Sequence, residues 1–584
     1  MSVFHSKTVA DQIVEELVAA GVQRIYGLTG DTLNSITDAV RRSGKIDWVH
    51  VRHEESAAFM ASAEAQLTGK LAVCAASCGP GSLHLLNGLY DAHRSMAPVL
   101  ALVTHIPSAQ IGMGYFQETH PEPIFRECSH YCELVSTAAQ MPRVLQIAMQ
   151  NAVGKGGVGV VILPGDIAAE KLPSDALQHP VVTTLPIMRP PDAVVQELAG
   201  MINDAKKVTL FCGAGCRHAH SEMMQLAQVT QAPVGYAYRG KQYVEPDNPH
   251  AVGMNGLLGW GACFDAVHEC DLLLLLGTDF PYPNFYPTKC KIAQIEMRPE
   301  HIGRRCRIDL GLLGDVGETL RVLLPHLTPK LDHTFLDETL AEHQKKVYDM
   351  GVYVRDPKDN ALIHPEYLAA AINEAASSNA IFSVDTGAVN IWEARFVRAS
   401  KDRRFLISTL HGSMANALPF AIAAQKTYPD RQVISLSGDG GLAMLMGELL
   451  TVMQYDLPIK IIVFNNSSLG FVKLEMETAG YPAWQTDLKN PDFAKMAEAI
   501  GLLGVRVEQS SDLKTGLARA LAHPGPALVD VVTDPNALSM PPKITAEQAE
   551  GFSITMGKLM LSGNAQEVAK IVESNLRNAV NVPL

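Results

Sequence analysis

Two short polar motifs carry the side chains in this sequence that are best suited to chemistry. Gly438-Asp439-Gly440 follows an expected strand at residues 433–436, and Asn465-Asn466 follows another at residues 460–464. The 24 residues between the motifs include a helix expected at about residues 442–455. Strand, helix and strand then form a right-handed crossover with parallel strands. Both carboxyl ends lie at one sheet edge, which places Asp439 beside Asn466.

The oxygen atoms at that edge suit a magnesium ion. A carboxylate from Asp439, an amide oxygen from Asn466 and a backbone carbonyl near Ser468 are hard ligands, and diphosphate oxygens and water would complete an octahedron. The glycines let backbone N–H groups approach phosphate at a helix N-terminus. Gly-Asp-Gly alone would fit an ordinary strand, turn and helix equally well. The double asparagine at this spacing favours the cofactor interpretation.

A second set of motifs lies in the middle of the chain, where Gly213-Ala214-Gly215 follows an expected strand at residues 208–212. Gly-x-Gly is weak evidence, because the third glycine of a dinucleotide fingerprint is absent. Further strands end in small or acidic residues, at Gly277-Thr278-Asp279-Phe280, Glu296-Met297-Arg298 and Gly314-Asp315. These ends would place polar groups along a sheet edge where a dinucleotide can lie.

The elements that position these motifs predict an α/β protein with three doubly wound parallel-sheet domains and a C-terminal helical tail. Short aliphatic strands alternate with amphipathic helices in three stretches, and Pro-containing linkers separate them. The predicted boundaries are residues 1–180, 190–330 and 345–534, with the tail at 535–584. Expected strands are residues 24–27, 71–76, 99–104 and 158–163, then 208–212, 272–276 and 291–296, then 380–384, 433–436, 460–464 and 527–532.

Composition narrows the classes of function. The chain has 584 residues, 47% hydrophobic and 19% charged, with a formal net charge of −13. An acidic chain without a basic block argues against nucleic acid as a partner. Ten cysteines are too few for a disulfide scaffold, so the three C-x3-C pairs are interpreted as reduced core thiols rather than zinc sites. They are Cys74/Cys78, Cys128/Cys132 and Cys212/Cys216.

The sequence predicts a cytoplasmic or peripheral location. Its first residues carry acidic side chains and no continuous apolar stretch of the kind found in a signal peptide. The longest purely aliphatic run, residues 272–276, is far shorter than the roughly 20 residues of a membrane-spanning helix.

Several motifs together resemble the thiamine-diphosphate enzymes of the decarboxylase and acetolactate synthase group, whose diphosphate motif is GDG…NN. They are Arg52-His53-Glu54-Glu55, Ser77-Cys78-Gly79-Pro80-Gly81 and His411-Gly412-Ser413-Met414. The resemblance covers nearly the whole chain. Within the group, the sequence is most similar to the bacterial pyruvate oxidases, including those that reduce a quinone. Four stretches carry the narrower similarity: Gly114-Tyr115-Phe116-Gln117-Glu118-Thr119-His120, Phe125-Arg126-Glu127-Cys128-Ser129-His130-Tyr131, Ser413-Met414-Ala415-Asn416-Ala417 and Leu469-Gly470-Phe471-Val472.

The resemblance implies roles for residues around thiamine diphosphate. Glu54 would hydrogen-bond the aminopyrimidine ring, and an apolar site would raise its pKa so that the carboxyl can donate. Met414 would hold the bend between the two rings of the cofactor. The alternatives are a solvated acid at its own helix N-terminus for Glu54 and a core methionine for Met414. The other cofactor contacts that the resemblance implies are Gly412, Ser413, Asp439, Gly440, Gly441, Asn466, Ser467, Ser468, Leu469, Gly470 and Phe471.

The same resemblance implies a small substrate pocket that suits pyruvate. Phe116, Gln117, Leu469, Phe471, Val472 and Glu475 match the positions that line it. The alternative is ordinary core packing for the apolar residues and an exposed loop for Gln117.

The middle domain of the resembled enzymes binds FAD, with an arginine and backbone amides on its diphosphate. Some relatives keep the domain without a flavin, so a domain without FAD is the alternative. The residues expected at FAD are Gly213, Gly215, Arg239, Leu257, Leu258, Gly259, Trp260, Gly277, Thr278, Phe280, Glu296, Arg298 and Asp315.

The tail has four basic and four acidic residues from residue 539 onward, and apolar side chains at helical spacing. These are Phe552, Met556, Leu559 and Met560, then Val568, Ile571 and Val572. A neutral amphipathic segment is consistent with an interfacial helix, although it has no Trp or Tyr as an anchor. In the quinone-reducing relatives such a tail covers the active site at rest and docks on the membrane. A helix packed on a neighbouring subunit is the alternative.

The function implied by the resemblance is oxidative decarboxylation of pyruvate to acetate and CO2, with electrons passing through FAD to a membrane quinone at the inner face of the cell membrane. The resemblance also implies an active site shared between subunits, hence at least a homodimer, and a tetramer is the expected assembly. Three rivals remain open: a phosphate- and oxygen-dependent pyruvate oxidase, an acetolactate synthase with a structural flavin, and a catalytically silent binding protein. Leu474-Glu475-Met476 stands where acetolactate synthases have a tryptophan and a glutamine, and Glu54, Asp439 and Asn466 together argue against a silent protein.

Overall fold

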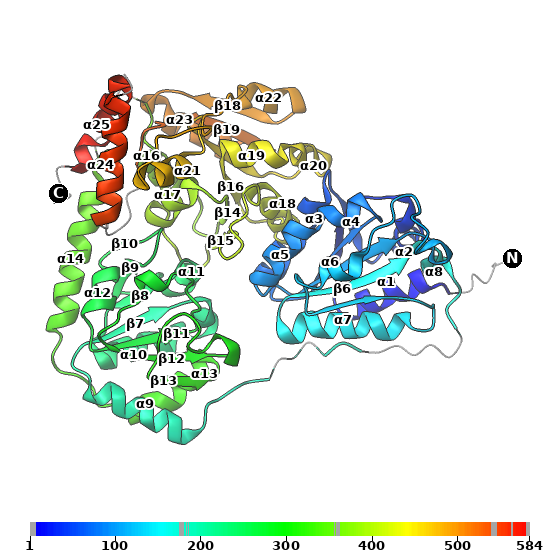
Figure 1. Ribbon diagram of the computed structural model, residues 1–584, viewed down its shortest axis with the longest axis horizontal. Coiled ribbons are helices and arrows are strands. Elements are labelled where there is room, and N and C mark those ends of the chain that lie inside the picture. The colour runs from blue at the N-terminus through cyan, green and yellow to red at the C-terminus, as the bar shows by residue number, and fades with distance from the viewer. Residues whose placement is uncertain are drawn as a thin grey trace.

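The computed structural model describes residues 7–173, 180–182, 184, 186–355, 357, 362–538, 546–561 and 564–579. These residues form three sheets, each in its own domain (Figure 1). The N-terminal domain, in blue and cyan, lies to one side of the view, and the green middle domain lies below the yellow and orange C-terminal domain. The three-domain α/β prediction, with its helical tail, is confirmed.

The N-terminal sheet has six parallel strands in the order β2-β1-β3-β4-β6-β5. All seven residues of β4 are buried, as expected for a parallel strand covered on both faces. Its strands are β1 (Arg24–Gly27), β2 (Asp47–His50), β3 (Ala72–Ala76), β4 (Val99–His105), β5 (Tyr131–Leu134) and β6 (Val158–Pro164). Its helices are α1 (Val9–Ala19), α2 (Asn34–Ser43), α3 (Glu54–Thr68), α4 (Pro80–His84), α5 (Leu86–Arg94), α6 (Pro121–Phe125), α7 (Met141–Lys155) and α8 (Gly165–Ala169).

The middle sheet has seven strands in the order β10-β9-β8-β7-β11-β12-β13. The sequence predicted only three of them, and the short edge strand β10 runs antiparallel to β9, which corrects the all-parallel expectation. Its strands are β7 (Val208–Cys212), β8 (Val234–Tyr236), β9 (Ala251–Met254), β10 (Trp260–Gly261), β11 (Leu272–Leu276), β12 (Lys291–Glu296) and β13 (Leu310–Leu313). Its helices, and those leading out of it, are α9 (Asp192–Asp204), α10 (His220–Thr230), α11 (Lys241–Val244), α12 (Cys263–Glu269), α13 (Val316–Leu323), α14 (Thr334–Met350) and α15 (Val352–Arg355).

The C-terminal sheet has six parallel strands in the order β15-β14-β16-β17-β19-β18. The helix expected at residues 442–455 is interrupted: α19 (Asp439–Leu445) and α20 (Leu449–Gln454) are separated by a 3-10 turn at Met446–Glu448. The strands are β14 (Ile381–Val384), β15 (Arg404–Leu406), β16 (Val433–Gly438), β17 (Lys460–Asn465), β18 (Leu503–Val507) and β19 (Ala527–Val532). The other helices are α16 (Pro365–Ala375), α17 (Ala388–Phe396), α18 (Ala417–Thr427), α21 (Gly470–Thr478), α22 (Phe493–Ile500) and α23 (Leu513–Ala522).

The N- and C-terminal domains share one apolar core within the chain. Helix α3 packs against α18, and the rings of Phe59 and Phe420 meet edge to face with centroids 5.8 Å apart. Most residues of α3 are buried, so the helix is enclosed around nearly its whole circumference rather than on one face. It ends where Gly69 takes a left-handed conformation. This shared core fixes the N-terminus of α3, where Glu54 lies.

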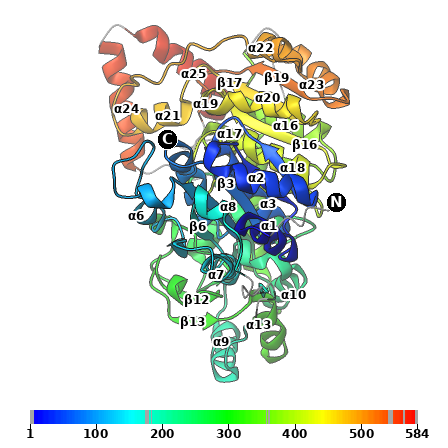
Figure 2. The same ribbon diagram turned by 90° about the vertical axis from the view of Figure 1, so that its right-hand side faces the viewer.

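The tail forms two helices, α24 (Ala546–Leu561) and α25 (Ala565–Ala579). Both lie beside the C-terminal domain, and α24 packs on α21 (Figures 1 and 2). Within the described residues, no helix combines the length and the apolar character needed to cross a bilayer.

Candidate active site

The two polar motifs of the C-terminal domain lie at one sheet edge. Strands β16 and β17 are parallel neighbours, with Gly438 opposite Phe464, so Asp439 and Asn466 follow at adjacent strand ends. Asp439 is buried and begins α19. Its Oδ1 accepts the backbone N–H of Gly440 at 3.0 Å, and its Oδ2 accepts an N–H from Asn490 at 2.7 Å. Burial raises the pKa of Asp439 to about 6.

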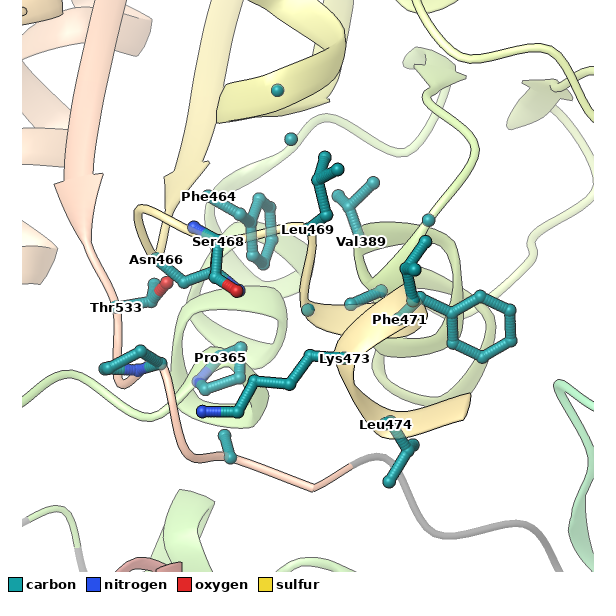
Figure 3. Close-up of a pocket in the computed structure, with 18 of the residues that line it drawn as sticks. Pro365, Val389, Phe464, Asn466, Ser468, Leu469, Phe471, Lys473, Leu474 and Thr533 are labelled. Carbon is teal, nitrogen blue, oxygen red and sulfur yellow. The ribbon is translucent and has the colours of Figure 1, made fainter. Parts of the chain in front are cut away.

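Both side chains line one cavity of about 100 Å³. Figure 3 shows Asn466, Ser468 and Leu469 on the loop between β17 and α21, with Val389 of α17 nearby. The cavity is lined by Pro365, residues 386–389, Trp392, Met414, residues 438–441, Phe464, Asn466, residues 468–474, Glu477, residues 533–538 and Ile571. The described residues thus bring the acidic, amide and apolar groups of the predicted cofactor site to one place.

The loop after β17 has a constrained backbone. Ser467 has φ of +53°, a left-handed conformation that is uncommon for a residue with a side chain. The turn is closed by the backbone N–H of Ser468, which donates to Asn466 Oδ1 at 3.0 Å. Ser468 Oγ is buried and makes no hydrogen bond with any described residue. An oxygen left in this state beside a carboxylate and an amide is consistent with a site for a polar ligand.

Met414 lies over the glycine of the first motif. A Cβ on Gly440 would come 3.5 Å from Met414 Cε and 3.0 Å from Leu469 Cδ2. Ala415, directly after Met414, has φ of +68°. The preceding Ser413 accepts an N–H from Asn87 of the N-terminal domain at 2.8 Å, and Gly412 also has a positive φ. The predicted methionine position is therefore part of the cavity wall and is held by a strained loop.

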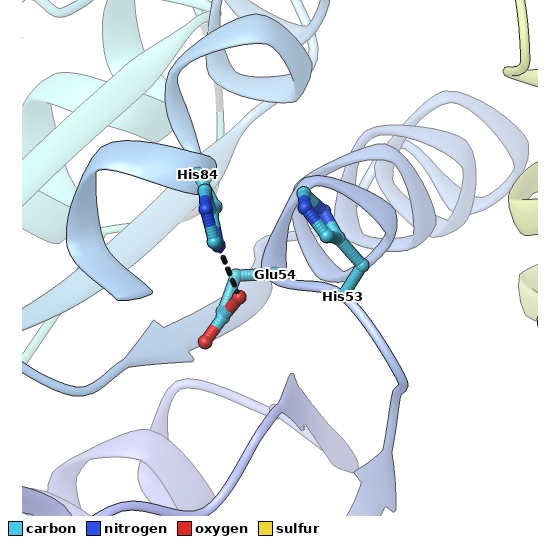
Figure 4. Close-up of side chains that lie close together, drawn as sticks. All are labelled: His53, Glu54 and His84. Carbon is cyan, nitrogen blue, oxygen red and sulfur yellow. Dashed lines mark hydrogen bonds and ion pairs between the residues drawn. The ribbon is translucent and has the colours of Figure 1, made fainter. Parts of the chain in front are cut away.

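Glu54 lies at the N-terminus of α3 and is buried. Its Oε2 lies 2.9 Å from His84 Nδ1, and the His84 ring stacks on His53 with centroids 4.3 Å apart (Figure 4). A Cβ on Gly81 would come 2.9 Å from Glu54 Oε1, so a larger residue there would displace the carboxylate. Glu54 does not line the cavity that holds Asp439 and Asn466 in the same chain.

A carboxylate from the C-terminal domain fixes the turn before Glu54. Glu448 Oε1 accepts the backbone N–H groups of Arg52 and His53, both at 3.0 Å. Its Oε2 accepts the hydroxyl of Thr451 at 2.6 Å, and burial raises the pKa of Glu448. The interruption between α19 and α20 places Glu448 at this contact.

The residues expected around the substrate divide between two surfaces. Leu469, Phe471 and Val472 line the cavity, whereas Glu475 does not, and burial raises the pKa of Glu475. Phe116 is 77% exposed on the N-terminal domain. Its neighbour Gln117 has φ of +63° and accepts a hydrogen bond from Cys78 Sγ at 3.4 Å.

The middle domain places the expected flavin residues at strand ends, in varied environments. A Cβ on Gly213 would come 2.5 Å from the carbonyl oxygen of Gly277, and a Cβ on Gly215 would come 2.6 Å from Gly277 Cα, so the three backbones pack tightly. The segment after Gly213 is a 3-10 turn, Ala214–His218, rather than the start of a long helix. Thr278 is buried, and Phe280 packs edge to face on Phe211.

The charged members of that set already have partners in the chain. Arg239 donates to the carbonyl of Ser95 at 2.9 Å, and Arg298 donates to the carbonyl of Lys155, both in the N-terminal domain. Asp315 caps α13 by accepting the N–H of Glu318 at 3.0 Å, and burial raises the pKa of Glu296.

Trp260 lies in the edge strand β10 beneath the guanidinium of Arg398, while Leu257, Leu258 and Gly259 form the turn before it. Flavin binding by these residues stays a prediction.

Three residues near the site were missed by sequence reasoning. Asp385 follows β14, and its carboxyl accepts backbone N–H groups from Thr386, Ala415 and Asn416, while burial raises its pKa to about 7. A Cβ on Gly441 would collide with Asp385 Oδ2 at 1.7 Å, which explains that glycine. The rule applied to Asp439, an acid directly after a buried strand, would have found Asp385. His84 and Asn490 had no local signal, because their partners are distant in sequence.

Comparison with known protein families supports the same site. The N-terminal TPP-binding domain of thiamine pyrophosphate enzymes matches residues 7–124, the central domain matches residues 195–323, and the C-terminal TPP-binding domain matches residues 385–531. The last match spans both motifs and the cavity residues from Thr386 to Glu477.

Individual relatives extend over nearly the whole chain. A putative thiamine pyrophosphate-containing protein of Bacillus subtilis, YdaP, is 34% identical over 97% of this chain and 99% of its own length. The pyruvate oxidase of Lactiplantibacillus plantarum is 31% identical over 89% of this chain and 87% of that enzyme. A probable acetolactate synthase large subunit of Methanocaldococcus jannaschii is 30% identical, covering 91% of this chain and 93% of that protein. The chain therefore belongs to the thiamine pyrophosphate enzyme family.

Proposed function

We propose that this protein catalyses oxidative decarboxylation of pyruvate, in which pyruvate, water and a quinone give acetate, CO2 and a quinol. Thiamine diphosphate, Mg²⁺ and FAD would be its cofactors. The observation that carries the proposal is the single cavity in which Asp439, Asn466 and Met414 meet the apolar residues at the start of α21.

The residues present fit the diphosphate and its cation. Asp439 and Asn466 offer hard oxygen atoms on the cavity, and Ser468 contributes its backbone carbonyl. Gly440 and Gly441 allow backbone N–H groups at the start of α19 to approach phosphate oxygens. Gly470, Ser467 and Phe471 complete the loop on the other side. The buried and unpaired Ser468 hydroxyl is the observation that supports a polar ligand here.

When bound, thiamine diphosphate supplies a carbon nucleophile and takes up the electron pair released as CO2 departs. The chain's own residues would set up that step. Met414 would support the bend of the cofactor, and Glu54 would hold a proton at the aminopyrimidine ring. His84 would orient the Glu54 carboxylate through the contact of 2.9 Å. Leu469, Phe471 and Val472 would exclude water from the reacting carbons.

We further propose that FAD binds along the edge of the middle sheet and accepts two electrons when bound. Gly213, Gly215 and Gly277 would allow close approach of the dinucleotide, and Arg239 and Arg298 would exchange their carbonyl partners for its diphosphate. The similarity to a pyruvate oxidase over most of the chain supports this assignment.

A second candidate is acetolactate synthesis from two pyruvates with a structural flavin. The similarity to a probable acetolactate synthase, at nearly the identity of the pyruvate oxidase, favours it. Two observations favour the oxidase instead: the Leu474-Glu475-Met476 sequence beyond the pocket, and a tail that packs on the helix carrying those residues.

The test is acceptor and product profiling of purified protein with Mg²⁺ and thiamine diphosphate. We expect yellow protein whose flavin absorbance is bleached by pyruvate without oxygen, acetate as product, and faster turnover with a quinone than with oxygen plus phosphate. If acetolactate is the main product and the flavin is not bleached, the protein is an acetolactate synthase and not an oxidase. If the protein instead forms acetyl phosphate in the presence of oxygen, its electron acceptor is oxygen and not a quinone.

A further inference from the structure

A chain of hydrogen bonds leads from Asp439 across the edge of the C-terminal sheet, through the half-buried Asn490 to the buried Asn465 and Asp530. Asn490, in the segment between α21 and α22, donates from Nδ2 to Asp439 Oδ2 at 2.7 Å and to Asn465 Oδ1 at 3.1 Å. Asn465 donates in turn to Asp530 Oδ1 at 2.9 Å. Asp530 is fully buried, and its other oxygen accepts from Arg506 and from the backbone N–H of Phe493.

This network gives the first asparagine of the pair a role that differs from that of the second. Asn466 lines the cavity, whereas Asn465 is buried in the last position of β17 and does not. Both polar ends of the Asn465 side chain are occupied, by Asn490 and by Asp530. Asn465 therefore anchors Asn490 and is not available to a cation.

The geometry also fixes the orientation of Asp439. A side-chain amide nitrogen has two protons, and Asn490 uses one on Asp439 and the other on Asn465. Asp439 Oδ1 accepts the backbone N–H of Gly440, Oδ2 accepts from Asn490, and the backbone N–H of Ser467 adds a further hydrogen bond to the carboxylate. The carboxylate is thus held in one orientation before any ion arrives.

We infer that Asn490 is a positioning residue for Asp439, and that through this contact it sets both the affinity and the size selectivity of the cation site. The inference rests on the proposed magnesium site. Partners that orient a metal ligand commonly change metal affinity by about 10- to 100-fold when removed. Mg²⁺ requires near-ideal octahedral geometry, while Ca²⁺ accepts irregular geometry and longer bonds. Loss of Asn490 should therefore weaken the binding of Mg²⁺ much more than the binding of Ca²⁺.

The experiment follows binding of thiamine diphosphate through protein fluorescence while Mg²⁺ or Ca²⁺ is titrated. Trp392 lines the cavity and provides the signal. We compare Asn490→Ala and Asn490→Leu, which remove the donor with and without loss of volume, with Asn379→Ala, an exposed asparagine of the same domain. We expect the Mg²⁺ half-saturation to rise by about 10- to 100-fold in both Asn490 variants. The Ca²⁺ value should rise by no more than about threefold, and Asn379→Ala should match the unmodified protein.

The outcomes separate this inference from the site on which it rests. If the variants lose affinity for Mg²⁺ and Ca²⁺ equally and also melt at a lower temperature, Asn490 only supports the fold. Unchanged half-saturation in both variants would remove the positioning role while leaving the magnesium site intact. Binding of thiamine diphosphate that is independent of any divalent cation in the unmodified protein would overturn the site and the inference together.

Discussion

Strained backbone lies beside several of the side chains proposed for function. Gln117, Ala415 and Ser467 have left-handed φ values, and they lie next to Phe116, Met414 and Asn466. Such a conformation costs about 1–3 kcal/mol in a residue with a side chain and persists only where the surroundings enforce it. Beside Ala415, Ser413 accepts a hydrogen bond from Asn87 of the N-terminal domain, and beside Ser467, the backbone N–H of Ser468 donates to Asn466 within the same loop.

Glu54 is the residue whose chemistry is most directly testable. We expect Glu54→Gln to bind thiamine diphosphate but to lose activity by roughly 10²- to 10⁴-fold, because the amide cannot exchange a proton with the ring. The measurements are cofactor binding by fluorescence and turnover of pyruvate. Glu55→Gln is the matched control, since its amide oxygen can still accept the hydrogen bond from Asn87 at 2.6 Å. Normal turnover in Glu54→Gln would refute the proposed role.

The contribution of Glu16, in α1, to the stability of the fold should depend on pH. Burial raises its pKa from 4.5 to about 7. Because the folded-state pKa is the higher one, the contribution is fully present below pH 4.5 and is lost as the pH rises toward 7. The free energy of unfolding should fall by about 2 kcal/mol, which is less than the full pKa change would give, because solvent partly screens this carboxylate. Glu16→Gln should show a smaller fall in the free energy of unfolding between pH 5 and pH 8, measured by urea denaturation. An unchanged slope would contradict the raised pKa.

At the scale of elements, the packing of α24 on α21 connects the tail to the candidate site. Thr555 is fully buried and donates to the carbonyl of Glu477 at 2.8 Å, and Lys558 donates to the carbonyl of Gly480 at 2.8 Å. Helix α25 is held by Asn575, which bonds both Leu538 and Asn536 of the cavity wall. Met560 and Val572, expected on the apolar stripe, are instead exposed, and they leave apolar surface on the outer side of the tail.

Gly551 controls this contact, because a Cβ there would meet the carbonyl oxygen of Thr478 at 2.0 Å and the backbone nitrogen of Gly480 at 3.2 Å. Backbone atoms cannot move aside, so we expect Gly551→Ala to undock α24. Limited proteolysis should then remove the tail faster. If the tail covers the site at rest, pyruvate-dependent quinone reduction without lipid should rise as well.

The control for this variant lies six residues further along the same helix. A Cβ on Gly557 meets nothing within 4 Å, so Gly557→Ala should keep the tail protected and gain up to about 1 kcal/mol of helix stability. Equal proteolysis of the two variants would show that the tail is not held through Gly551.

At the scale of the whole molecule, the two halves of the proposed site lie on different surfaces of the part of the chain that the structure describes. Glu54 and Phe116 are absent from the cavity that contains Asp439. Each half is accompanied by exposed apolar side chains, Met113 and Phe116 on the N-terminal domain and Val472 and Trp484 on the C-terminal domain. This arrangement supports an active site completed by a second copy of the chain.

Mixed oligomers test that sharing. Glu54→Gln and Asp439→Ala should each be nearly inactive, whereas coexpressed chains form mixed dimers in which one site receives both defects and the other receives none. We expect recovery of about a quarter of the unmodified activity, because half of randomly formed dimers are mixed and half of their sites are intact. The measurement is pyruvate turnover of doubly tagged protein, scaled to the total mixture. No recovery would mean that each chain builds its own site.

The sequence alone determined the interior of this fold. The strands at residues 208–212, 272–276, 291–296 and 527–532 were predicted with the bounds that the structure has, since a run of mainly apolar residues is stable when both faces of the strand are covered. The adjacency of Asp439 and Asn466 was also predictable, because the handedness of the crossover is a general property of parallel strands. Short strands such as β8 and β15 gave no comparable pattern, and their pairing depends on neighbours that are distant in the chain.

Only the tertiary structure decided which distant groups hold the site. Asn490 reaches Asp439 across 51 residues, His84 reaches Glu54 across 30, and Glu448 reaches His53 across 395. The tail could be predicted as helical from its spacing, yet its docking depends on a glycine that fits against the backbone at Thr478. Hydrophobic periodicity specifies which face of an element is buried, but hydrogen bonds between elements depend on side chains that only the packed chain brings within 3 Å.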